Sequence, residues 1–166
     1  MSAATIVLIA ATCAAAAVDV RTRKIPNGLT AATALLALAV HVPEGIAPVL
    51  IALATMALAF LAGSVAYSAG WFGGGDVKLI AACCGVVGGI AALSLVLDIL
   101  AAGAVLALVT AAFRGRLVAL VRSTAAVAAH GAPVEKNTLP YAVAIAAGSI
   151  IYTVSTLVPV LRFPLS

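Results

Sequence analysis

The feature that most constrains this fold is a pair of long apolar runs, Ile46–Tyr67 and Ala91–Phe113. Together they contain a single charged side chain, Asp98. A helix needs roughly 20 predominantly apolar residues to cross a bilayer, and both runs reach that length. Hydrophobic residues make up 65% of the chain and charged residues only 8%. Because a water-soluble domain needs a more polar exterior, the sequence predicts an integral membrane protein embedded in a lipid bilayer.

Apolar segments recur along the whole chain, and we predict an all-α, polytopic membrane protein with about six transmembrane helices. The predicted segments are Ala3–Val18, Ile25–Val42, Ile46–Tyr67, Val77–Gly89, Ala91–Phe113 and Leu139–Val160. The second and fourth are the weakest candidates, because runs of roughly 10 to 14 apolar residues are more typical of buried or re-entrant segments. No internal repeat is evident, so residues 1–166 are expected to form one domain.

The positive charges predict how the segments are oriented. Lys and Arg follow alternate segments: Arg21, Arg23 and Lys24 after the first, Lys78 after the third, and Arg114, Arg116 and Arg122 after the fifth. Cytoplasmic connections are enriched in these residues. We therefore expect both termini outside, the stretch Arg114–Thr138 in the cytoplasm, and a location in the inner (cytoplasmic) membrane.

Two of the five acidic residues, Asp19 and Asp76, lie at boundaries of apolar segments. Ionisable groups at membrane depth are costly and are usually retained for function. Each also has a structural interpretation: Asp76 as a helix N-cap, and Asp19 as a loop partner of Arg21 or Arg23. Two predicted segments separate the two aspartates, so both should face the same side of the membrane. This expectation holds only if Ile25–Val42 crosses.

Two carboxylates held close together can act as an acid and base pair. They share one proton, because both cannot ionise cheaply. The ionised carboxylate then draws a proton from water while the protonated one polarises a peptide carbonyl. Glycines at Gly73 and Gly75 let the backbone before Asp76 take conformations that other residues disfavour. The sequence Ile25, Pro26 and Asn27 reads as a rigid turn that starts a helix.

The two motifs together resemble those of a known family. Asp19-x-Arg21-x-Arg23-Lys24-Ile25-Pro26-Asn27, followed by Gly73-x-Gly75-Asp76-x-Lys78, is similar to the pattern of the type IV prepilin peptidases, which are membrane aspartic proteases of the GxGD kind. The resemblance implies that Asp19 and Asp76 are catalytic. It also implies that Gly73, Gly75, Lys78, Ile25, Pro26 and Asn27 support the active site.

The resemblance also implies a substrate and a reaction. Such enzymes remove the short basic leader of prepilins and pseudopilins at the cytoplasmic face, before a hydrophobic helix. Larger members carry an added N-terminal region with a cysteine zinc motif and methylate the new N-terminus, whereas this sequence starts almost directly at the first predicted segment and shows no such cysteines. It looks like the short form of the Flp/Tad pilus systems. We expect no methyltransferase activity, no metal and no cofactor.

Other function classes fit the sequence less well. Cys13, Cys83 and Cys84 form no CxxC pair and lie in apolar runs, where packing is the ordinary role of cysteine. No basic stripe with interleaved aromatic residues suggests a nucleic-acid partner. A GxGD protease with other membrane substrates remains open, although the Ile25-Pro26-Asn27 turn favours the prepilin type. A small transporter or secretion-channel subunit with a proton relay also remains open, and Asp98 alone fits it.

Overall fold

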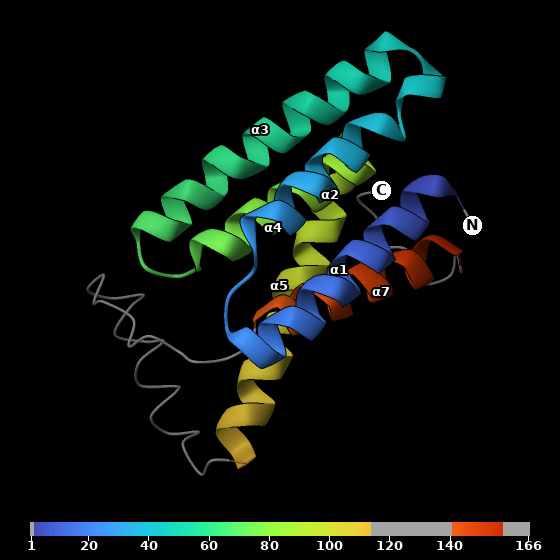
Figure 1. Ribbon diagram of the computed structural model, residues 1–166. Coiled ribbons are helices and arrows are strands. Elements are labelled where there is room, and N and C mark those ends of the chain that lie inside the picture. The colour runs from blue at the N-terminus through green and yellow to red at the C-terminus, as the bar shows by residue number, and fades with distance from the viewer. Residues whose placement is uncertain (1, 114–140, 158–166) are drawn as a thin grey trace.

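The computed structural model describes residues 2–113 and 141–157, which form six α-helices (Figure 1). These are α1 (Ala3–Thr22), α2 (Asn27–Ala39), α3 (Ile46–Ser68), α4 (Gly74–Val87), α5 (Ala91–Phe113) and α7 (Tyr141–Leu157), with one 3-10 turn, η1 (Val42–Glu44), before α3. No strand occurs in the described ranges, and the predicted all-α class is confirmed there. The predicted loop Arg114–Thr138 lies outside them.

Three of the described helices, α1, α3 and α5, are long and apolar enough to cross a membrane, and α7 is apolar but has 17 residues. The two weakest predicted segments are shorter still, with 13 residues in α2 and 14 in α4. At 1.5 Å per residue each covers only about 20 Å, against a hydrocarbon core of about 30 Å. Crossing by α2 and α4 therefore stays a prediction.

Pro26 and Pro43 explain why α2 is shorter than the predicted segment Ile25–Val42. Pro26 precedes the helix with extended backbone at φ −63° and ψ 136°. After Ala39 the chain turns, and Pro43 lies within η1. Proline fixes φ and has no N–H to donate, so a helix continues poorly through it. The helix therefore occupies only the 13 residues between these two turns.

Successive helices run in opposite directions, so the end of α1 and the starts of α2, α4 and α7 lie at the same end of the bundle. α2 and α4 run parallel as direct neighbours, with α3 antiparallel along the outer side of α4 (Figure 1). α1 and α7 pack against each other on the other side, and α5 packs on both α7 and α4. The largest fully buried side chains come from four helices: Leu8, Leu79, Val86, Leu95, Ile99 and Ile145.

Glycines allow the helices to approach closely. A Cβ on Gly63 of α3 would lie 2.7 Å from Cγ1 of Val77 on α4, and a Cβ on Gly148 of α7 would lie 2.5 Å from the Ile99 Cα on α5. Helix association within a bilayer relies on such small-residue contacts, because lipid leaves no hydrophobic driving force between helices. The two α3–α4 and α5–α7 interfaces therefore depend on glycine.

α1 continues four residues beyond the predicted segment Ala3–Val18. It starts at Ser2, whose hydroxyl accepts the Thr5 N–H at 3.2 Å, as N-caps commonly do. It ends where Arg23 adopts the left-handed conformation, φ 54°, and donates its N–H to the Asp19 carbonyl at 2.8 Å. Asp19 consequently belongs to the last turn of a helix and not to a loop.

Candidate active site

Asp19 is a buried carboxylate at the C-terminal end of α1, with 6% of its surface exposed. An anion is disfavoured at that end of a helix, because the last carbonyls carry partial negative charge. The start of α7 compensates: the Ala142 N–H donates to Asp19 Oδ2 at 3.3 Å. The first N–H groups of a helix have no partner within the helix and favour negative charge. Asp19 is thus stabilised by a helix 123 residues away in sequence.

Asp76 is the third residue of α4, and its carboxylate caps that helix. Oδ2 accepts the Gly73 N–H at 3.2 Å, which agrees with the structural interpretation that Asp76 stabilises a helix start. A Cβ on Gly73 would lie only 2.7 Å from the same oxygen. A glycine at position 73 therefore leaves the space in which the Asp76 carboxylate bonds.

Asp76 lies outside the three segments that are long enough to cross a membrane. Burial, and to a lesser extent the negative charge of Asp19, raise the pKa of its carboxyl group from 3.8 to about 6, and the bond from Gly73 opposes both. Asp19 is therefore near enough to Asp76 for the two carboxylates to interact electrostatically. The two predicted aspartates, 57 positions apart, come together at one end of the bundle.

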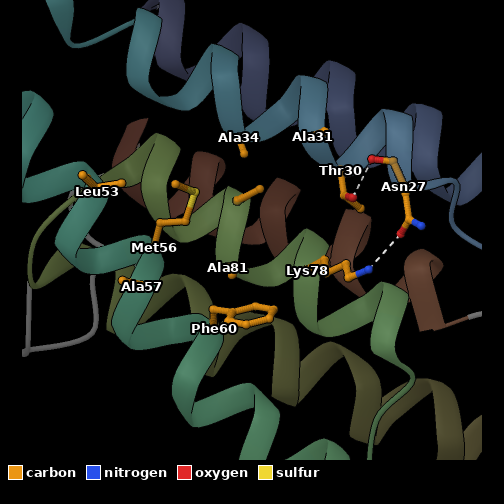
Figure 2. A pocket seen from close by; sticks show the side chains of 11 residues that line it. Asn27, Thr30, Ala31, Ala34, Leu53, Met56, Ala57, Phe60, Lys78 and Ala81 are labelled. Carbon is orange, nitrogen blue, oxygen red and sulfur yellow. Dashed lines mark hydrogen bonds between the residues drawn. The ribbon is translucent and has the colours of Figure 1, made fainter.

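The two predicted motifs also contact each other directly. Lys78 Nζ donates to Asn27 Oδ1 at 2.9 Å (Figure 2). A Cβ on Gly75 would lie 3.2 Å from the Ile25 Cβ, so the backbone of α4 lies tightly against the turn that follows Asp19. Pro26 fixes the start of α2 just beyond that turn. All eight predicted site residues are thus gathered around the end of α1 and the starts of α2 and α4.

Two aromatic residues that the sequence reasoning did not select lie at the same end. The rings of Phe72 and Tyr141 pack edge to face, with centroids 5.1 Å apart and planes at 73°. Tyr141, the first residue of α7, is near enough to interact electrostatically with Asp76. In the sequence, the only indication of this contact was position: Phe72 directly precedes the glycines, and Tyr141 directly follows Pro140.

Other polar residues lie elsewhere. Asp98 is buried within α5. His41 lies at the opposite end of α4, where Nε2 is 3.2 Å from the Val86 carbonyl and Nδ1 is 3.2 Å from Glu44 Oε2. These contacts join the α2–η1 turn to α4. Within residues 2–113 and 141–157, no three His, Cys, Asp or Glu side chains are grouped as metal ligands.

Comparison with known protein families gives a match. The model of the type IV leader peptidase family matches residues 6–119, which is more than half of the chain. The matched region contains Asp19, Asp76 and every other predicted site residue. No curated protein sequence and no solved structure matches this chain.

Proposed function

The chain belongs to the type IV leader peptidase family, and we propose that it is a membrane aspartic endopeptidase that removes the basic leader of Flp-like prepilins or pseudopilins. In this proposal it is a multi-pass protein of the inner membrane and cuts at the cytoplasmic face. The observation that carries the proposal is the like-charge interaction between the Asp19 and Asp76 carboxylates, at the end of the bundle where the two motifs meet.

The different surroundings of the two carboxylates suggest which chemical role each one has. Asp76, with a pKa of about 6, holds the shared proton and polarises the scissile carbonyl. Asp19, whose Oδ2 accepts the Ala142 N–H, is the base that takes a proton from the attacking water. Proton transfer by a positioned side chain is most effective when its pKa is near the working pH, and Asp76 meets that condition.

The substrate geometry fits the same end of the bundle. A leader cleaved just before a hydrophobic helix presents its scissile bond at the membrane boundary. Asp19 and Asp76 lie at such a boundary, because α1 is long and apolar enough to span and ends three residues after Asp19. A proton relay would instead place its carboxylates in mid-helix, as Asp98 is placed.

A cleavage assay tests the proposal. The protein is co-expressed with a Flp-type prepilin, and the size of the prepilin is followed on a gel for wild type, Asp19→Asn and Asp76→Asn. Each substitution should lower cleavage by about 10²-fold to 10⁴-fold, the usual contribution of a general acid or base, and the double variant should be no worse because the pair acts as a unit.

Asp98→Asn is the matched control, since it removes a buried carboxylate that is separate from the pair. It should cleave like wild type. Normal processing by either Asp19→Asn or Asp76→Asn would rule out the two-carboxylate mechanism. Loss of processing in Asp98→Asn with the other two intact would favour the proton-relay alternative.

A further inference from the structure

An apolar groove of about 470 Å³ lies between α2, α3 and α4 (Figure 2). Its floor and the α2 side are formed mainly by alanines, and the α3 side by larger apolar side chains. The lining residues are Asn27, Thr30, Ala31, Ala34, Leu53, Met56, Ala57, Phe60, Lys78, Ala81 and Ala82. Ala31 and Ala34 of α2, which line the groove, have short side chains and leave space beside the α4 surface.

Only one end of the groove is charged. Lys78 lies there with Asn27, and the Lys78 ammonium donates to the neutral Asn27 amide oxygen at 2.9 Å. Within the described part of the chain, no carboxylate lies within ion-pair distance of Lys78. The same end of the bundle carries four cationic side chains, Arg21, Arg23, Lys24 and Lys78, against the two carboxylates Asp19 and Asp76. The groove therefore combines an apolar channel with a positively charged mouth.

The groove faces away from the paired carboxylates. Asp76 and Lys78 are two residues apart on α4, which places their side chains roughly 200° apart around the helix axis. Asp76 interacts with Asp19 of α1, whereas Lys78 bonds to α2 and lines the groove. A peptide held between Asp19 and Asp76 therefore does not need this channel, and the groove is suited to a different occupant.

We propose that the groove binds an anionic phospholipid, with an acyl chain along the alanines and the phosphate at Lys78 and Asn27. A lysine ammonium carries three N–H donors, so two remain after the bond to Asn27. The Asn27 amide group uses its oxygen for Lys78 and keeps its own N–H donors for a phosphate oxygen. Basic pockets between membrane helices on the cytoplasmic side are suited to anionic headgroups. This inference does not depend on the proposed protease activity.

Such a lipid would also support the contact between the motifs. Its phosphate would bridge Lys78 of the glycine motif and Asn27 of the turn motif, and its chain would fill the space that separates α2 from α3. The bound lipid would therefore hold α2 against α4 at the end where Asp19 and Asp76 meet.

Native mass spectrometry of the full chain in detergent tests this proposal. The protein is titrated with dioleoyl phosphatidylglycerol or, separately, dioleoyl phosphatidylcholine, and retained lipid is counted. Wild type should retain the anionic lipid about fivefold more strongly, the ratio that one lysine contributes near an anionic lipid. Lys78→Gln should abolish that preference. Glycerophosphoglycerol, which has the headgroup but no chains, should not displace the bound lipid.

Two variants of α3 separate the groove from the general lipid-facing surface. Ala57→Phe places a ring in the groove and should lower retention of the anionic lipid to the level of the zwitterionic one. Ala54→Phe, on the same helix and also exposed but not lining the groove, should behave like wild type. Equal retention by Ala57→Phe, Ala54→Phe and wild type overturns the proposal. If Ala57→Phe instead blocks prepilin cleavage while lipid retention stays normal, the groove holds the substrate helix and the lipid proposal is wrong.

Discussion

Asp19 and Asp76 are the same residue type at opposite kinds of helix end. Asp19 ends α1, where the helix dipole opposes a negative charge, and Asp76 begins α4, where the dipole favours one. Yet Asp19 obtains a backbone N–H from another helix, α7, whereas Asp76 uses the N–H of Gly73 just before its own helix. Position at a helix start therefore does not by itself keep the pKa of Asp76 low. Burial and the neighbouring charge raise the pKa of Asp76 despite its favourable helix position.

The largest expected effect on stability is that of Asp76→Asn. Because the pKa of Asp76 rises from 3.8 to about 6 on folding, the folded protein binds more protons than the unfolded chain between these values. Stability therefore falls as pH rises through that window, by as much as about 3 kcal/mol for a shift of this size. Asn keeps a capping oxygen and has no charge to bury. Asp76→Asn should thus be more stable than wild type at pH 7.5 and equal to it near pH 3.5.

Thermal unfolding in micelles at the two pH values measures this difference. Asp19→Asn provides the comparison, since it removes the second cause of the shift and leaves burial, the larger one. Its stability should still fall with pH, but less steeply than that of wild type. If the stability of the wild type does not change between pH 3.5 and 7.5, the pKa of Asp76 is not raised on folding.

The next effect concerns the contact that positions the carboxylates. Gly75→Val would force α4 away from Ile25, because even a Cβ at position 75 lies 3.2 Å from the Ile25 Cβ. A displacement of about 1 Å in a catalytic arrangement costs roughly a hundredfold in rate, and that loss is expected in prepilin cleavage. Gly28→Val is the matched control, since a Cβ at Gly28 meets nothing within 4 Å. Equal cleavage by the two variants would show that the contact between the motifs does not position the pair.

The helix bounds and the location of the two aspartates could largely be predicted from the sequence, because they follow from the hydropathy pattern and the order of the two motifs. The bounds of α5 match the predicted segment, and the common location of Asp19 and Asp76 follows from alternating helices. The extension of α1 to Thr22 could not be predicted in the same way. Polar residues after Val18 suggested a loop, but the left-handed Arg23 and the bond from Ala142 keep Asp19 helical.

The partners of the site residues were not predictable either. The bond from Ala142 and the Phe72–Tyr141 ring contact join segments that are distant in sequence. A backbone N–H leaves no mark on the sequence, because every residue except proline has one. The resemblance named Lys78 as part of the site, but only the packing of α2 beside α4 shows that its partner is Asn27.

A further effect is the pH dependence of cleavage. If Asp76 supplies the proton, the rate should fall about tenfold per pH unit once the pH exceeds its pKa of about 6, since only the protonated fraction can act as an acid. Initial rates of cleavage of a purified prepilin in micelles between pH 5 and 8.5 measure this. Enzyme held at pH 8.5 and returned to pH 6 should recover its full rate, which separates titration from unfolding. A constant rate from pH 6 to 8.5 would place the proton elsewhere.

The smallest effect concerns the bond between Lys78 and Asn27, which lies on the side of α4 turned away from Asp76. Both side chains are exposed, and hydrogen bonds contribute about 1 kcal/mol even in typical settings. A double-mutant cycle of Lys78→Met and Asn27→Leu, followed by thermal unfolding in lipid-free micelles, should give a coupling energy below about 1 kcal/mol. A larger coupling would mean that this bond, and not the Gly75–Ile25 contact, joins the two motifs. A small one leaves Lys78 free to serve a second partner, because little stability is lost when its ammonium turns from Asn27 toward a phosphate.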